Sequence, residues 1–166
     1  IESGEPKKAV ELLESIPDEG KKIVEVRLIL ARAHAAVQDL DAAIAEYQKV
    51  IELQPHYIFA YPAIGALYNE KGEKKKAAEM YLRYENKMTE MARTLENADK
   101  TDPVDRLNVL DIFSAVNDQR AVKAVKVALD DPNTAVRAKA ATTTGQMGIT
   151  SVRTKLEYMA KKDKTD

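Results

Sequence analysis

The sequence predicts an all-α fold, a solenoid of antiparallel helix pairs, and three observations support this prediction. Residues of the same class recur 34 positions apart through the first half of the chain, a period typical of helix-pair repeats. In the second half, two Asp-Pro steps 29 residues apart each precede another expected helix pair. Between the halves, an apolar stripe without Pro or Gly runs from Glu73 to Asn97 at spacings of three and four residues, which places it on one face of a continuous helix.

The composition of the 166 residues excludes several classes of protein. The hydrophobic share is 45% but aromatic residues make up only 5%, which favours closely packed helices over sheets. The absence of cysteine excludes disulfides, thiolate metal sites and a cysteine nucleophile. No apolar run is long enough to predict a membrane span. The compartment stays unknown: the cytoplasm is the default, and the periplasm applies if an upstream signal was removed, since the chain does not begin with Met.

In the first half, the 34-residue register links helix to helix. Gly4, Gln38 and Gly72 hold equivalent places at turns, and Leu30 and Ile64 are equivalent upstream. Further positions on the second helix of each unit recur in the same way: Ala9, Ala43 and Ala77; Leu13, Tyr47 and Tyr81; Ile16, Val50 and Tyr84. Small residues stand where two helices of a pair are expected to approach closely.

This pattern resembles the tetratricopeptide repeat over residues 1–97. The third unit matches best, with an aromatic residue, a branched aliphatic, Gly, Tyr, Gly, Ala and an aromatic at the family's positions: Tyr61, Ile64, Gly65, Tyr68, Gly72, Ala77 and Tyr81. The resemblance implies a right-handed superhelical solenoid that binds protein ligands. The first unit has only its second helix, from Pro6 to about Ile16, so we expect its partner helix upstream. Pro62 is tolerable only near the first turn of its helix.

Residues 102–163 form a second array in the prediction. Asp102-Pro103 and Asp131-Pro132 each indicate an N-cap followed by Pro at the first helical position, with helix breaks at 117–118 and 145–148. The run Asp131, Pro132, Val136, Arg137, Ala140, Ala141 and Gly145 resembles short bacterial HEAT-type repeats. Residues 164–166 are expected to be a frayed tail.

No enzyme signature is present, so we predict no catalytic residue, no metal and no cofactor. His34 and His56 are 22 residues apart and belong to no metal-binding spacing. His34 falls at the position of Tyr68 in the next unit, which favours a packing role over a ligand or switch role. The glycines form no phosphate-binding loop, and the serines lie in no nucleophile motif.

The predicted function is a non-catalytic scaffold, a module of a larger bacterial protein. In tetratricopeptide arrays the first helices of the pairs line a concave groove, and the resemblance carries this role to eight residues: Leu28, Ile29, Arg32, Ala35, Phe59, Ala63, Ala66 and Asn69. This mostly apolar set predicts a peptide or an amphipathic helix as the ligand rather than a clamped terminal carboxylate. The alternative is that these side chains only pack against neighbouring helices.

Two other interactions and a further role stay open. Basic residues recur through the second array and offer a face for nucleic acid or an anionic surface: Arg120, Lys123, Lys126, Arg137, Lys139, Arg153 and Lys155. No aromatic residues interleave with them, and residues 103–166 carry 11 basic against 8 acidic side chains, so this alternative is less favoured. The stripe Tyr84, Met88, Met91 and Leu95 is buried within the chain or forms a homodimer seam. A regulatory domain of an enzyme encoded upstream is the third reading of the chain's role.

Overall fold

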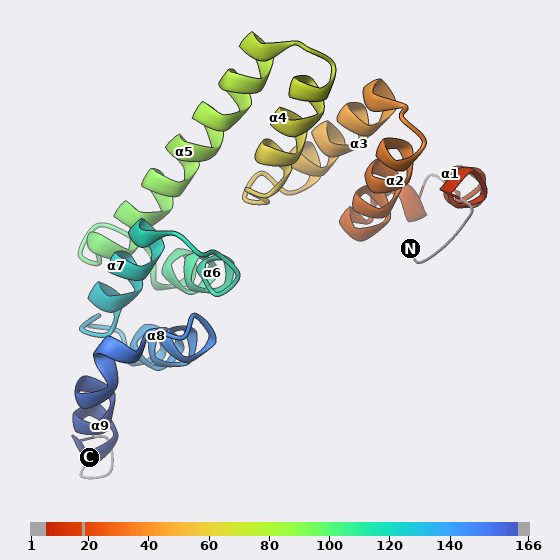
Figure 1. Cartoon of the computed structure of the whole chain (residues 1–166). Coiled ribbons are helices and arrows are strands. Elements are labelled where there is room, and N and C mark those ends of the chain that lie inside the picture. The colour runs from red at the N-terminus through yellow and green to blue at the C-terminus, as the bar shows by residue number, and fades with distance from the viewer. Residues whose placement is uncertain (1–5, 18, 163–166) are drawn as a thin grey trace. The chain divides into compact units, whose positions relative to one another are not determined.

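The computed structural model describes residues 6–17 and 19–162, and every regular element within them is a helix (Figure 1). This confirms the predicted all-α class. Helices contact their neighbours along the chain, from α1 through α4 and again from α6 to α8, as expected of a solenoid. The right-handed superhelical path stays a prediction. The predicted frayed tail, residues 164–166, lies outside the described residues.

The chain divides into two compact units, residues 1–86 (unit 1) and 87–166 (unit 2), and the division falls inside one long helix. That helix, α5, runs from Lys74 to Glu96, so the predicted uninterrupted helix is confirmed. The sequence placed the boundary after this helix, at residue 97. The contacts divide it earlier because Met88, Met91 and Leu95, in the second part of α5, are buried with unit 2.

Unit 1 contains α1, a short 3-10 helix η1, α2, α3, α4 and the first part of α5. Their bounds are α1 Pro6–Glu14, η1 Gly20–Lys22, α2 Val24–Ala36, α3 Leu40–Leu53 and α4 Ala60–Glu70. The pairs α2–α3 and α4–α5 follow the 34-residue register of the sequence. Pro62 is the third residue of α4, so it occupies the first turn, where its missing N–H has no partner to lose.

The turns within these two pairs have the same backbone conformation. Gln38 has φ 64° and Gly72 has φ 76°, so both equivalent positions lie in the left-handed region. Glycine adopts this region without steric cost, whereas a glutamine side chain is strained there. After the first turn, the Asp39 carboxylate accepts a hydrogen bond from the Ala42 amide and caps α3.

The core of unit 1 lies mainly between α3 and α4. Ala43 and Ile44 of α3 pack with Ile64 and Leu67 of α4, and half-buried side chains surround them: Ala35, Leu40, Tyr47, Ile51, Tyr68 and Met80. Within α2, Ala31 and Ala33 are completely buried. Small residues at these positions let helix backbones approach closely, as the repeat register predicted.

Unit 2 contains the rest of α5, then α6, α7, α8, the 3-10 helix η2 and α9. Their bounds are α6 Pro103–Phe113, α7 Gln119–Ala128, α8 Thr134–Gln146, η2 Thr150–Val152 and α9 Arg153–Lys162. The breaks fall where the sequence predicted them. The buried side chains come from every one of these elements up to η2, and the largest apolar ones are Met88, Leu95, Leu110, Phe113, Val125, Leu129 and Val136.

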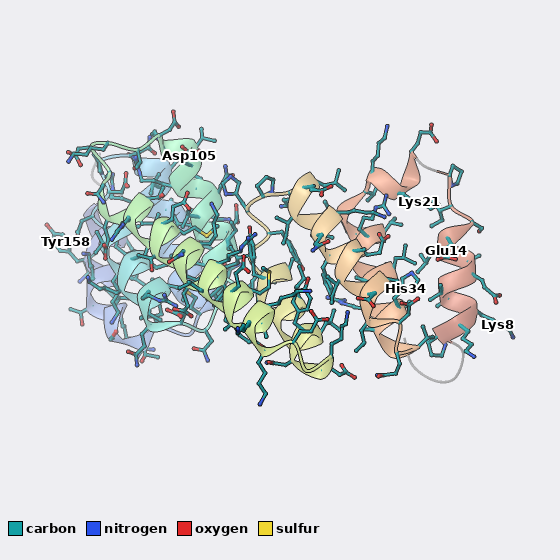
Figure 2. The ribbon with its side chains drawn as sticks, turned by 90° about the horizontal axis from the view of Figure 1, so that it is seen from above. Lys8, Glu14, Lys21, His34, Asp105 and Tyr158 are labelled. Carbon is teal, nitrogen blue, oxygen red and sulfur yellow. The ribbon has the colours of Figure 1, made fainter. Side chains whose placement is uncertain are left out.

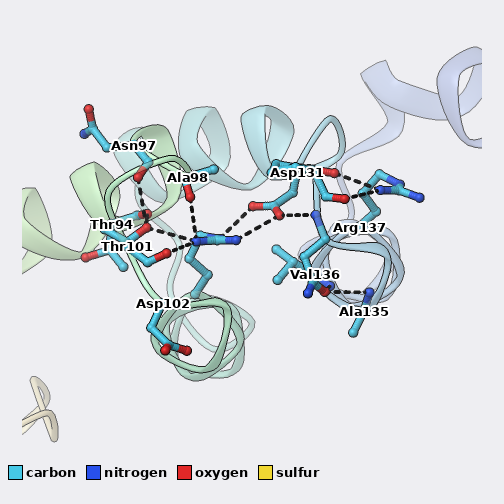
Figure 3. Close-up of polar contacts among 12 residues, drawn as sticks. Thr94, Asn97, Ala98, Thr101, Asp102, Asp131, Ala135, Val136 and Arg137 are labelled. Atoms are coloured by element: carbon cyan, nitrogen blue, oxygen red, sulfur yellow. Dashed lines mark hydrogen bonds and ion pairs between the residues drawn. The ribbon is translucent and has the colours of Figure 1, made fainter.

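A buried arginine connects three segments of unit 2 (Figure 3). Arg106 of α6 donates from Nη1 to the carbonyl oxygens of Ala98 and Thr101, and from Nη2 to Oδ1 of Asp131 at 3.1 Å. Its Nε lies 2.8 Å from Oδ2 of Asp131, an ion pair that is not aligned as a hydrogen bond. The Arg106 side chain is only 2% exposed.

This arginine explains why one predicted N-cap is wrong. Asp102 caps α6 as expected, accepting from the Val104 amide at 2.7 Å. Asp131 does not cap α8, which begins two residues later than predicted, at Thr134, with Asn133 as its N-cap. Asp131 instead pairs with Arg106 and accepts from the Asn133 amide at 2.8 Å. A tertiary partner therefore takes the carboxylate that the local sequence assigned to a cap.

Candidate functional site

The predicted binding residues of α2 lie on a face of that helix that its core contacts do not use. Ile29 is 42% exposed and Arg32 is exposed, whereas Leu28 is half-buried. Arg32 has no ion-pair partner among the described residues, in contrast to Arg27 of the same helix, which pairs with Glu46. This part of α2 presents apolar surface beside an available guanidinium group.

The fourth α2 residue of the predicted set has a different role. Ala35 is half-buried and packs against the core cluster of α3 and α4. For this residue, the structure is consistent with the packing alternative that the sequence left open.

On α4, the predicted residues divide between packing and exposure. Phe59 is half-buried, and its ring contacts that of Tyr57 edge to face with centroids 5.7 Å apart. Ala63 is half-buried, whereas Ala66 and Asn69 are exposed. The accessible part of α4 is therefore small and polar toward its end, and Phe59 is partly occupied by an internal contact.

Tyr81 belongs beside this face, although the sequence placed it in the buried stripe. It is 37% exposed, and its hydroxyl accepts a hydrogen bond from Nδ2 of Asn69 at 3.3 Å. A Cβ added at Gly65 would lie 2.9 Å from the Tyr81 ring, so the glycine lets this ring lie against α4. The 34-residue signature includes both Gly65 and Tyr81, and it was the signal that could have identified this contact.

Glu46 of α3 fixes α2 from the opposite side through two cations. Arg27 donates to Oε2 of Glu46 at 2.7 Å, and Lys49 donates to Oε1 at 2.8 Å. Burial raises the pKa of Glu46, but the hydrogen bonds from Lys49 and Arg27 and their charges outweigh burial, so the net pKa is lowered. This salt bridge holds the helix that carries Ile29 and Arg32.

A second charged cluster holds the turn between α4 and α5. Lys71 pairs with Asp41 at the start of α3 and with Glu73 at 3.0 Å, and Lys76 also pairs with Glu73. Hydrogen bonds from Lys76 and Lys71 lower the pKa of Glu73. The Lys76 ammonium lies 5.3 Å from the centre of the Tyr68 ring. The cluster connects the two repeats that carry the candidate face.

Most of the predicted basic residues of unit 2 contact acidic groups or carbonyls of the same chain. Lys123 pairs with Glu96 at 3.2 Å, Lys139 with Asp111, and Lys155 with Asp130. Because each pair joins residues of separate elements, these lysines help hold neighbouring segments together.

The predicted arginines of unit 2 behave differently from one another. Arg120 pairs with Asp118 at 2.8 Å, and its hydrogen bonds lower the pKa of that carboxyl group. Arg137 donates to the carbonyl oxygens of Asp131 and Pro132. Lys126 is half-buried and Arg153 is exposed, and neither has an ion-pair partner among the described residues. The available positive charge is therefore smaller than the sequence suggested.

The predicted homodimer seam is largely covered within one chain. Met88, Met91 and Leu95 are at most 4% exposed, and Tyr84 is half-buried. The homodimer stays an untested prediction, and a seam there would need this part of the chain to open.

The two histidines differ in the way the sequence predicted. His34 is buried between helices, and His56 is exposed after α3. Among the described residues, no group of three histidine, cysteine or acidic side chains is arranged to hold a metal ion. Within the same residues, none of the helices combines the length and the apolar composition needed to cross a bilayer.

Comparison with known proteins does not identify a family. No family model matches the sequence, and no curated protein matches it. Among solved structures, the chain is similar to two crystal structures of MamA, each with 22% sequence identity and a TM-score of 0.47. The matches cover 97% and 89% of this chain, and 72% and 68% of the respective MamA chains. At this identity and score, neither match assigns a function or a partner to this chain.

Proposed function

We propose that this chain is a non-catalytic protein-interaction module whose α2–α4 face binds a peptide or an amphipathic helix. The face comprises the exposed residues Ile29, Arg32, Ala66 and Asn69, with Leu28, Phe59 and Ala63 at its base. The observation that carries this proposal is that α2 and α4 complete a core and still leave an apolar and hydrogen-bonding surface. Exposed apolar residues flanked by polar groups are typical of recognition surfaces.

The core of unit 1 does not need these exposed side chains. Leu30, Ala31 and Ala33 are the buried positions of α2, and Ile64 and Leu67 are buried in α4. Ile29 and Ala66 lie next to these positions in sequence but on another face of each helix. Substituting the exposed residues is therefore expected to change binding without unfolding the unit.

A selection of displayed random peptides of about 16 residues tests this proposal. We expect the wild type to enrich peptides that the double variant Ile29→Glu/Ala66→Glu does not retain, with a loss of affinity of at least about tenfold. Leu53→Glu is the matched control, because Leu53 is 44% exposed at the end of α3, against 42% for Ile29. Equal retention by all three proteins, or no enrichment by the wild type, would contradict the proposal.

The alternative, binding of nucleic acid or an anionic surface by unit 2, has less support. Lys123, Lys139 and Lys155 are each paired with a carboxylate of the same chain. A strong decrease of affinity with salt would nevertheless favour it, because phosphate binding releases counterions. Binding to a random-sequence DNA probe at low salt, abolished by Arg153→Glu, is the result that would support this alternative.

A further inference from the structure

His34 lies between two carboxylates that come from different sides of α2. Its Nε2 is 3.6 Å from Oε1 of Glu14 on α1, and its Nδ1 is 3.7 Å from Oδ2 of Asp39, which precedes α3. The imidazole is only 8% exposed, and Nδ1 is buried without a hydrogen-bond partner. Figure 2 shows Glu14 and His34 next to each other where α1 faces α2.

The chemistry of imidazole makes this arrangement sensitive to protons. A neutral imidazole carries one N–H, so its other nitrogen presents a lone pair, and in either tautomer that lone pair faces one of the two carboxylates. Only the imidazolium ion presents a donor on both sides. Glu14 and Asp39 face opposite ring nitrogens, so a single metal ion could not bind all three groups. The site is arranged for a proton.

Other charged groups near α2 do not offset this arrangement. Lys21 and Lys22 of η1 precede α2, and His34 is ten residues beyond its start, a distance of about 15 Å along the helix. Figure 2 shows Lys21 well apart from His34. Asp41 of α3 is paired with Lys71. His34 also lies in the last turn of α2, where the helix dipole favours a positive charge.

We propose that His34 is a proton-dependent clasp that holds α1 against α2. Protonation gives Glu14 and Asp39 one ion-paired donor each, so the attachment of α1 strengthens as the pH falls through the range in which histidines ionise. The equivalent position of the next repeat is Tyr68, which does not ionise in that range. The device therefore belongs to one repeat, and it does not depend on the proposed peptide binding.

Hydrogen exchange of the α1 amides measures this attachment directly. A nine-residue helix does not persist alone in water, so protection of the amides of residues 10–14 reports the docking of α1. Protection factors, corrected for intrinsic exchange, are compared at about pH 5.5 and about pH 7.5. The amides of residues 64–67 in α4 serve as the internal reference. We expect α1 protection to rise about fivefold at the lower pH relative to α4.

The variants decide whether His34 causes this rise. His34→Gln should abolish the pH dependence of α1 protection, and Glu14→Gln should reduce it, whereas His56→Gln at the exposed histidine should leave it unchanged. Glu14 is 56% exposed, so its variant folds even if His34→Gln does not. Protection of α1 that is independent of pH in the wild type, or a full pH effect that persists in Glu14→Gln or His34→Gln, would overturn the proposal.

Discussion

The repeats α2–α3 and α4–α5 share one register but are held by different chemistry. Where α2 has Arg27 and α3 has Glu46, the next repeat has Tyr61 and Met80, each 34 residues on. The first pair is an ion pair at 2.7 Å, whereas Tyr61 is buried and Met80 packs against the apolar core. The comparison shows that the repeat register specifies where helices meet, while the residue type there sets sensitivity to charge and pH.

The largest effect is expected from breaking the ion pair in the first repeat. Glu46→Met leaves the Arg27 guanidinium mostly buried without its carboxylate, and its Nε already lacks a hydrogen-bond partner. We expect a loss of about 2 kcal/mol in the free energy of unfolding, because a charged group that loses its partner keeps its desolvation cost. Urea titration followed by circular dichroism measures this loss.

The double variant Arg27→Tyr/Glu46→Met sharpens the comparison, because it gives the first repeat the residues of the second. Apolar replacement of both members of an ion pair is often neutral or stabilising, so we expect most of the lost stability to return. A double variant as unstable as Glu46→Met would show that the two repeats are not interchangeable at these positions.

A smaller effect is expected at the turn, where Gln38 and Gly72 share the left-handed conformation. Gln38→Gly should raise the free energy of unfolding by about 1 kcal/mol, because glycine removes the steric cost of this backbone region. Gln38→Ala is the matched control and should give no such gain, since alanine keeps the Cβ atom. Equal stabilisation by alanine and glycine would assign the gain to loss of the side chain rather than to the backbone.

The sequence predicted the helices of both units because their evidence is local and periodic. The 34-residue register placed Gln38 and Gly72 in equivalent turns, and both have positive φ. The same reasoning assigned Asp131 to an N-cap, and it failed because Arg106, 25 residues away, binds that carboxylate. Spacing alone could not show which buried cation would compete with a helix end.

The candidate site was less accessible to sequence reasoning than the fold. A stripe at helical spacing shows which side chains share a face, but not how far the cover extends, so Tyr81 was placed in the core. Counting charges found Lys139 and Lys155 but not Asp111 and Asp130, the partners that only the packing of helices brings close. The binding role of Ile29 and Asn69 stays a proposal that rests on their exposure.

The smallest effect is expected from the pH dependence of the same ion pair. Arg27 and Lys49 keep the pKa of Glu46 below its ordinary value of 4.5 in the folded chain. A carboxyl group whose pKa is lowered by folding stabilises the protein above its unfolded pKa and loses this contribution as the pH falls through the folded value. The difference in stability between wild type and Glu46→Gln should therefore be present at neutral pH and vanish below about pH 4.

We expect this difference to be about 1 kcal/mol at neutral pH, since the pair is partly accessible to solvent. Chemical denaturation at a series of pH values measures it, and Glu52→Gln, an exposed carboxylate of the same helix, is the control that should show a smaller change. The Arg27→Tyr/Glu46→Met variant should lose the same acid-dependent component, because its first repeat then contains the uncharged residues of the second. If that variant kept the full acid dependence of the wild type, the contrast between the two repeats would not lie in Arg27 and Glu46.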